Sequence, residues 1–224
     1  MINIKISKRL EAVAKLIDKD ASIIDVGCDH ALLDIYLVLN KMVEKAIATD
    51  VTIGALKQAS KNISFYNLDK VIDTRLGDGI TVLNDNDKVN TIVISGLGFQ
   101  KIINILEDSK EKLTNTIIIQ SNNGVDLVRN KMMKLGYSIV KECMVKENDI
   151  IYTVIKFFKS KKRLSNKEIF FGPWLLNHKD DLFYEYYDEL LNTTISIYNR
   201  IPIKNHLKKI EFARKIRQIR KEIL

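Results

Sequence analysis

The segment IIDVGCDHALLDIYL, residues 23–37, decides the fold. Its first part is a short apolar run that stops at Gly27, and its last part is apolar at helical spacing. A buried strand that ends at a glycine and leads at once into a helix is typical of the first βα unit of an open parallel sheet. Ligands bind beyond the carboxyl ends of such strands, so residues 27–30 are the first candidates for a binding site.

The first two thirds of the chain repeat this alternation of apolar runs and helical periodicity. The runs are continuous, which predicts strands that are covered by helices on both sheet faces. They lie within residues 22–26, 45–51, 71–79, 90–98 and 115–123. Two later runs, 137–147 and 150–159, have only Asn148-Asp149 between them, which favours an antiparallel hairpin at one edge. The sequence therefore predicts an α/β fold with a mostly parallel, doubly wound sheet.

The last third differs in pattern and in charge. Residues 180–201 and 203–223 are long helical stretches on either side of Pro202, which predicts a helical hairpin. The second stretch carries Ile203, Leu207, Ile210, Ala213, Ile216 and Ile223 on one side. Residues 160–224 hold 14 Lys and Arg against 8 Asp and Glu, whereas residues 1–159 are close to neutral. We expect a binding domain at 1–159 and a basic helical subdomain at 160–224, suited to a polyanion unless its lysines are simply a solvated surface.

The composition excludes several classes of protein. No apolar run approaches the roughly 20 residues that span a bilayer, and the charged N-terminus does not read as a signal peptide. Cys28 and Cys143 lie far apart without Cys or His companions, so we expect neither a disulfide nor a metal site. A reducing cytoplasm agrees with this.

Polar residues follow four of the predicted strands: Gly27 and Asp29, then Asp50, Asp78, and Ser95-Gly96. A dinucleotide site would require GxGxxG so that a pyrophosphate could lie on the helix N-terminus. Here a single glycine is followed by a carboxylate, which disfavours an anion and makes a nicotinamide dehydrogenase the weakest alternative. Asp50 suits the two hydroxyls of a ribose, although an aspartate here can simply cap the next helix.

Asp78, between Gly77 and Gly79, suits an exocyclic amine such as adenine N6, or else belongs to an ordinary turn. Carboxylates at successive strand ends favour a ligand with adenine, ribose, no phosphate and a positive charge, namely S-adenosylmethionine. The residues that we expect to bind it are Gly27, Asp29, Asp50, Val51, Asp78, Gly79, Ser95 and Gly96.

The motifs SKRLEAVAKLI, DVGCDHALLDIYL, AIATDVTIGAL, RLGDGI, ISGLGFQKI, IIIQSNNGVDLVR and FGPWLL together resemble the bacterial tRNA (adenine-22-N1)-methyltransferases, the TrmK family. This resemblance implies a Rossmann-like class I methyltransferase domain, S-adenosylmethionine as methyl donor, and N1 of adenine 22 in tRNA as acceptor. It also implies a coiled-coil-like C-terminal subdomain. The chain departs from the family pattern at Leu32, Asp34, Phe99 and Ser121, which affects the acceptor pocket more than the donor site. Phe99 is a candidate to replace the stacking ring lost at Leu32.

Three residues are candidates for catalysis. Asp29 would stabilise the positive charge that develops on the methylated adenine. Asn122 would hydrogen-bond the base edge or the amine of the donor, and His30 would relay a proton or contact a phosphate, unless it is structural. For tRNA binding we expect Lys204, Lys208, Lys209, Arg214, Lys215, Arg217 and Arg220.

Two other functions remain open from the sequence. A methyltransferase that acts on another RNA base, a protein or a small molecule would use its basic tail differently, for example for dimerisation. A non-catalytic RNA-binding module on a degenerate nucleotide-binding fold is the other alternative, although intact carboxylates at several strand ends argue against it.

Overall fold

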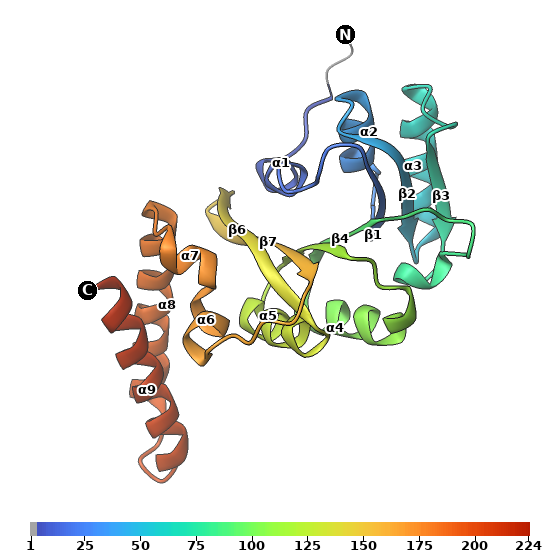
Figure 1. Cartoon of the computed structure of the whole chain (residues 1–224). Coiled ribbons are helices and arrows are strands. Elements are labelled where there is room, and N and C mark those ends of the chain that lie inside the picture. Colours follow the sequence, from blue (N-terminus) through green and yellow to red (C-terminus); the bar gives the residue numbers. More distant parts are fainter. Residues whose placement is uncertain (1–3) are drawn as a thin grey trace. The chain divides into compact units, whose positions relative to one another are not determined.

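A seven-stranded sheet forms the centre of the first two thirds of the chain in the computed structural model, which describes residues 4–224 (Figure 1). The strand order is β3-β2-β1-β4-β5-β7-β6. The strands are β1 (Ala21–Val26), β2 (Val43–Asp50), β3 (Ile72–Leu76), β4 (Thr91–Leu97), β5 (Thr116–Ser121), β6 (Tyr137–Glu147) and β7 (Ile150–Lys159).

The first five strands run parallel, and β7 is antiparallel to both β5 and β6. The turn between β6 and β7 is built on Asn148 and Asp149, which both have positive φ angles, as tight hairpin turns require. The order reverses between β1 and β4, since the chain winds outward from β1 in both directions. The predicted mostly parallel sheet with a hairpin edge is confirmed, and the reversal marks the place where such sheets bind ligands.

Helices cover both faces of this sheet (Figure 1). The bounds in the first part of the chain are α1 (Lys8–Ala14), α2 (Leu32–Leu39), α3 (Ile53–Phe65), α4 (Phe99–Asp108) and α5 (Val125–Lys134), with 3₁₀ turns η1 (Gly79–Val82) and η2 (Lys110–Lys112). Successive strand residues alternate between two cores: Ile23 faces the core under α1, α2 and α3, whereas Ile24 faces the core under α4 and α5. Both faces are apolar, which is why the strand runs are continuous in sequence.

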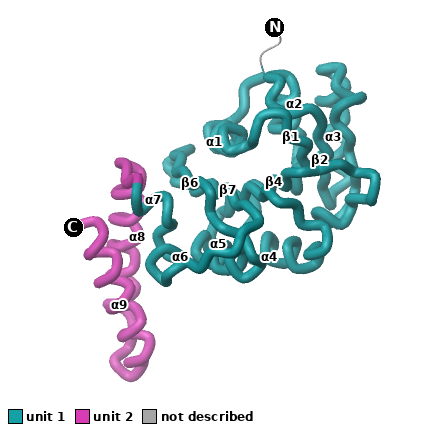
Figure 2. The backbone as a smooth tube through the Cα atoms, in the orientation of Figure 1, with its two compact units in different colours: residues 1–177 teal, residues 178–224 magenta. Residues whose placement is uncertain are grey.

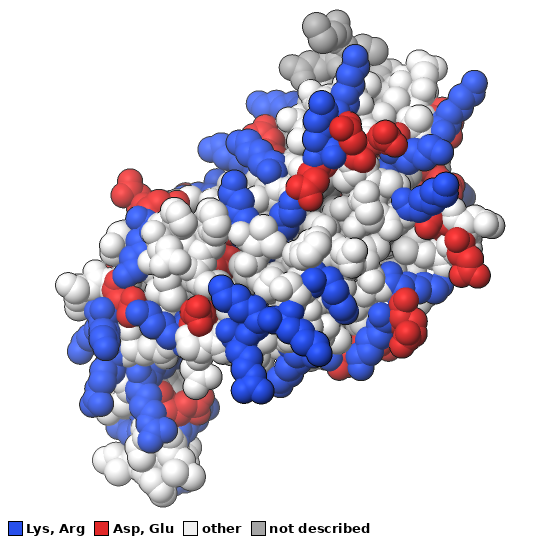
Figure 3. Space-filling model, in the orientation of Figure 1, with Lys and Arg blue, Asp and Glu red and all other residues white. Residues whose placement is uncertain are grey.

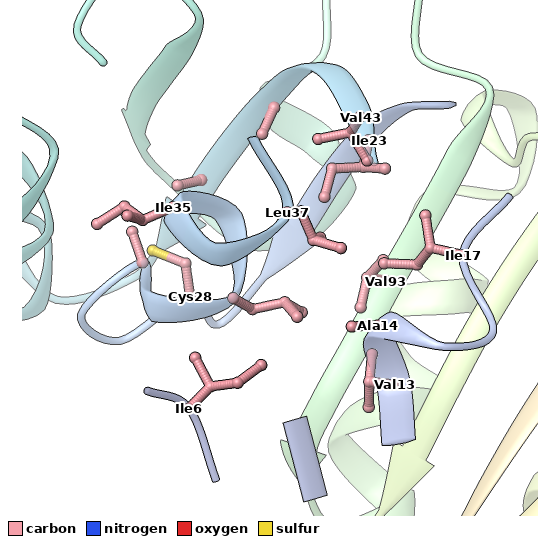
Figure 4. Packing of buried hydrophobic residues seen from close by; sticks show 14 of the residues in the cluster. Ile6, Val13, Ala14, Ile17, Ile23, Cys28, Ile35, Leu37, Val43 and Val93 are labelled. Carbon is pink, nitrogen blue, oxygen red and sulfur yellow. The ribbon is translucent and has the colours of Figure 1, made fainter. Parts of the chain in front are cut away.

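The core between the sheet and helices α1 and α2 includes residues of β1, the strand that leads into the loop at Gly27. Figure 4 shows Val13 and Ala14 of α1, Ile35 and Leu37 of α2, and Ile23 of β1 among its buried side chains. Buried side chains in a protein core are closely packed, so this core holds α1 and α2 against β1.

Two short helices after β7 belong to the same compact unit, which spans Met1–Asn177 (Figure 2). They are α6 (Asn166–Phe171) and α7 (Pro173–Asn177). Arg129 of α5 is buried, bonds Glu142 of β6 at 2.7 Å, and donates to the carbonyl oxygens of Ile169 and Phe170. The compact unit therefore extends beyond the predicted boundary at residue 159, because the buried Arg129–Glu142 pair, which joins α5 to β6, also bonds α6.

The second unit, His178–Leu224, is a helical hairpin of α8 (Asp181–Arg200) and α9 (His206–Ile223). The two helices pack against each other, and Lys209 of α9 lies over the ring of Tyr198 of α8. A turn closed by the bond from Asn205 N to Pro202 O joins them. The hairpin predicted around Pro202 is confirmed.

Candidate functional site

The loop between β1 and α2 has an unusual backbone. Gly27, Asp29 and Ala31 all have positive φ angles, of 77°, 51° and 54°. The amides of Gly27 and Cys28 donate to Thr49 O of β2, so the loop begins in register with the sheet. An alanine in this conformation is strained, and such strain persists where the surrounding structure holds it. The result is a rigid loop that presents Asp29, with 73% of its side chain exposed, at the strand ends.

The next two strand ends present the other carboxylates. Oδ1 of Asp50 accepts from both the amide and the hydroxyl of Thr52 at 2.8 Å, so one oxygen of this carboxylate holds the residue that precedes α3 and does not cap the helix itself. Asp78 is exposed between two glycines. A Cβ at Gly77 would lie 2.3 Å from Val82, and one at Gly79, where φ is +60°, would lie 2.9 Å from Ile105. Only glycines let this loop pack tightly and turn Asp78 outward.

A cavity of about 430 Å³ lies at these strand ends. This volume is in the range of small-molecule sites. Its wall includes every residue that the sequence predicted for the donor: Gly27, Asp29, Asp50, Val51, Asp78, Gly79, Ser95 and Gly96. Three carboxylates therefore meet at one cavity. The sequence did not identify Arg9, Thr52, Ala55 or Lys101, which also line it.

Arg9 is the most connected of the missed residues. Its Nη1 atom donates to Gln120 Oε1 at 2.6 Å and to Ser95 Oγ at 3.0 Å, and its guanidinium lies over the ring of Tyr152. Gln120 is fully buried and also accepts from the amide of Gly96. One signal was available in the sequence: a glutamine that ends the apolar run TIIIQ requires a buried hydrogen-bond partner.

A smaller hollow of about 90 Å³ adjoins the first. Four residues line both cavities: Arg9, Gly27, Asp29 and Ser95. His30 lines the smaller one, with its Nε2 atom 3.5 Å from Asp29 Oδ1. The structure thus brings two of the three predicted catalytic residues together, and Asp29 lies where the two cavities meet.

Asn122 occupies a different position. Its Nδ2 atom donates to Gly96 O at 2.7 Å, and its Oδ1 atom accepts from Gln120 at 3.2 Å. It is exposed, but the residues that line the two cavities in the described part of the chain do not include it. Asn122 therefore contacts the site through Gly96, and its role remains a prediction.

Two of the departures from the family pattern have a clear structural place. Leu32 lines the smaller hollow, where it supplies an apolar wall without a ring. Phe99 lies against Gly124, since a Cβ there would be 2.7 Å from its ring, and it packs on the core under α4 and α5. The ring of Phe99 is thus engaged in packing.

A third departure, Asp34, creates a buried carboxyl pair under the site. Asp25 of β1 and Asp34 of α2 are 5% and 0% exposed. Burial raises the pKa of Asp25 to about 7, against the opposing effects of the bond to Asp34 and the Arg9 charge. Burial, and then the charge of Asp25, raise the pKa of Asp34 well above its usual range. Apart from Asp25, neither side-chain oxygen of Asp34 has a hydrogen-bond partner among the described residues, so burial favours the protonated form of this carboxyl.

The predicted RNA-binding residues all lie in the helical hairpin. Lys204, Lys208, Arg214, Arg217 and Arg220 are exposed, whereas Lys209 and Lys215 are partly buried. Figure 3 shows Lys and Arg side chains gathered along this hairpin. An RNA contact by these residues remains a prediction.

The comparisons with known proteins agree on one family. Its sequence model, described as tRNA (adenine(22)-N(1))-methyltransferase, matches residues 23–221. The chain belongs to this family. A Bacillus subtilis protein described by the same words is 32% identical over 209 residues, which cover 90% of this chain and 87% of that protein. The predicted resemblance is confirmed.

Two solved structures extend the likeness to the fold. A Streptococcus pneumoniae protein in complex with S-adenosyl-L-methionine superposes with a TM-score of 0.91 at 30% identity, covering 98% of this chain and all of the other. An M. capricolum family member in complex with S-adenosyl-homocysteine gives 0.88 at 34% identity over 97% of each chain. The methyltransferase variant of the predicted α/β fold is confirmed.

Two further properties of residues 4–224 bear on function. No group of three or more His, Cys, Asp or Glu side chains in this range is placed to hold a metal ion. None of the helices described there is long and apolar enough to cross a bilayer.

Proposed function

We propose that this protein transfers a methyl group from S-adenosylmethionine to N1 of adenine 22 in tRNA, in the cytoplasm. The observation that carries the proposal is the cavity at the reversal of the sheet, lined by Asp29, Asp50 and Asp78, in a chain of the tRNA (adenine(22)-N(1))-methyltransferase family. A carboxylate-lined cavity without a phosphate-binding glycine loop favours a cationic nucleoside over a dinucleotide.

The residues around the cavity suit each part of this donor. Asp50 has one oxygen engaged by Thr52 and a second that can accept from ribose hydroxyls, while Asp78 suits the exocyclic amine of adenine. Val51, 48% exposed, offers an apolar surface to the base. At the other end of the cavity Arg9 suits the carboxylate of the donor, and Asp29 its positive charges.

The lone pair on the unprotonated N1 of adenine attacks the methyl carbon of S-adenosylmethionine, and the carbon–sulfur bond breaks so that neutral S-adenosylhomocysteine leaves. No side chain has to remove a proton. The protein has to align the reacting groups and exclude water. The methylated base gains a positive charge, which Asp29 stabilises from the junction of the two cavities. His30, 3.5 Å from Asp29, lies beside that carboxylate and lines the smaller hollow.

The acceptor atom lies on the Watson–Crick edge of its base, so the base has to leave its stack at a cost of a few kcal/mol. Phosphate contacts offset this cost and make affinity depend strongly on salt. The exposed cations of α9 and of the turn before it are our candidates for these contacts.

Methyl transfer to defined tRNA transcripts tests the proposal. The full chain is incubated with labelled S-adenosylmethionine and a transcript that has adenine at position 22, and with a matched transcript in which only that base is guanine. We expect one methyl group per adenine-22 transcript, a reverse-transcription stop at that nucleotide, and no label in the control. Label at another position, or equal labelling of both transcripts, contradicts the proposal.

A further inference from the structure

The end of the helical hairpin exposes an apolar surface. Ile203 is 86% exposed in the turn between α8 and α9, and Leu207 and Ile210 of α9 are 74% and 46% exposed. The buried residue of α9 is Ile219, with Ile216 and Ile223 partly buried near it in sequence. The apolar side expected from the sequence is therefore divided, and its first half, which we call the hairpin tip (Ile203, Leu207 and Ile210), is open to solvent.

The residues around the hairpin tip are almost all basic. Between residues 200 and 217 there are seven Lys and Arg and a single acidic residue, Glu211. Lys204 and Lys208, both exposed, alternate with the tip residues along the chain. Figure 3 shows uncharged atoms at the end of the hairpin, with Lys and Arg side chains next to them. A surface of this charge attracts a polyanion and repels a second copy of itself.

Nucleic acid is a polyanion that offers apolar surface together with phosphates. The phosphates of a regular RNA helix can satisfy the lysines, but its bases are stacked and leave no face for aliphatic side chains. Bases in loops, bulges and at the ends of stacks expose their faces, and side chains such as Leu and Ile can cover or wedge against them. A solvent-exposed Leu and two Ile gain free energy when such a face covers them.

We propose that the hairpin tip covers exposed base faces in a looped part of the tRNA, while the neighbouring lysines contact the phosphates on either side. This inference rests on tRNA as the substrate and adds which kind of RNA surface the second unit recognises. The two groups of residues then have separate effects. The lysines set affinity for any RNA, and the hairpin tip sets the preference for folded tRNA over a plain duplex.

Binding of the full chain to two RNAs separates these effects. The probes are a tRNA transcript and a blunt RNA duplex with the same number of phosphates, both at one salt concentration and across a salt series. For the double variant Leu207→Ser/Ile210→Ser, we expect tRNA affinity to fall by about tenfold or more and duplex affinity to change by less than about twofold. For Lys204→Gln/Lys208→Gln, we expect both affinities and the slope of log Kd against log salt to fall.

Two controls keep the result interpretable. Ile203→Ser changes a turn residue that is almost fully exposed, so it tests the hairpin tip even if the double variant folds poorly. Phe65→Ser removes a 72% exposed apolar side chain from the first unit and should leave both affinities unchanged. Affinity for S-adenosylmethionine should be the same in all these variants.

Three results would overturn the inference. Equal losses for tRNA and duplex would make the hairpin tip a general part of the phosphate contact. Unchanged tRNA affinity in both serine variants would remove the tip from RNA binding. Binding of the wild-type chain to phosphatidylserine vesicles that is lost in the serine variants, while tRNA binding is kept, would identify a membrane surface instead. If the wild-type chain methylates adenine 22 in each case, the proposed function stands and only this inference fails.

Discussion

Nη1 of Arg9 lies 2.6 Å from Oε1 of Gln120, a bond between the first helix and the end of β5, 111 residues apart in sequence. The same glutamine oxygen accepts from the amide of Gly96, and its amide nitrogen donates to Asn122. One guanidinium thus helps to fix the end of β4 and the orientation of two carboxamides. A side chain that sequence analysis missed organises the two predicted residues Gly96 and Asn122.

Arg9→Ala should therefore impair catalysis more than stability. The change leaves the buried Gln120 oxygen without its charged donor and removes the cation that we assign to the donor carboxylate. We expect kcat/KM to fall by about tenfold or more, with KM for S-adenosylmethionine raised. Arg9→Lys should recover only part of this, since an ammonium does not reproduce the geometry of a guanidinium. Steady-state kinetics measure kcat/KM and KM for both variants. Lys8→Ala, which changes the exposed residue next to Arg9, is the control. Loss of stability with unchanged kinetics would make the role of Arg9 purely structural.

The two glycines beside Asp78 should be intolerant of a methyl group. Gly77→Ala forces a contact at 2.3 Å with Val82, and Gly79→Ala combines a contact at 2.9 Å with a positive φ. We expect each to lower the free energy of unfolding by about 1–3 kcal/mol, measured by urea denaturation. Gly54→Ala is the matched control because no atom lies within 4 Å of the added methyl and the site is helical. It should stabilise by about 0.5–1 kcal/mol. If all three alanine substitutions change the free energy of unfolding equally, close contact of the added methyl group with Val82 or Ile105 is not the cause of the effect.

Asp34→Asn should raise stability in a pH-dependent way. The pKa of Asp34 is raised in the folded chain, so the folded state keeps a proton that the unfolded chain releases, and wild-type stability falls as pH rises from about 4 toward 7. Asparagine has no proton to lose and can donate to Asp25. We expect the free energy of unfolding to exceed that of wild type by about 1–3 kcal/mol at pH 8.

The gain from Asp34→Asn should shrink toward pH 4, because the folded pair then keeps both protons and the unfolded carboxyls, with an ordinary pKa of 3.8, have regained part of theirs. Chemical denaturation across this pH range measures the difference, and the exposed Asp85→Asn is the control. A gain that is the same at pH 4 and pH 8 would mean that the raised pKa values of the pair are not its cause.

The length of the first unit can be tested by shortening the chain. Ending it after Asn177 should keep the cavity and its affinity for S-adenosylmethionine and abolish tight tRNA binding. Ending it after Lys159 removes the carbonyl partners of the buried Arg129–Glu142 pair and should cost about 1–3 kcal/mol of stability. Thermal and urea unfolding of the two shortened chains measure the difference. If the two shortened chains are equally stable, the first unit ends near residue 159 and α6 is not part of it.

Local sequence patterns were sufficient for the fold. Continuous apolar runs identified the central strands β1, β4 and β5, and Asn148-Asp149 identified the hairpin edge, because a strand covered on both faces and a tight turn each leave a local signal. Carboxylates at successive strand ends were sufficient to predict the cavity, since parallel strands bring their carboxyl ends to one edge.

Long-range contacts left no such signal. Arg9 reaches the site from a helix that precedes the whole sheet, and α6 joins the first unit through Arg129, which lies 40 residues from Ile169. Periodicity also did not distinguish the packed half of α9 from its open half. Leu207 and Ile219 are both apolar, and only the three-dimensional packing shows that one is exposed and the other buried.

The structure of the full chain crystallised with S-adenosylmethionine tests the central claim most directly. We expect the compound in the 430 Å³ cavity, with its ribose hydroxyls within hydrogen-bonding distance of Asp50, its adenine beside Asp78 and its sulfur facing the Asp29 junction. Density for the compound elsewhere on the protein, or in this cavity with all three carboxylates turned away from it, would contradict the account.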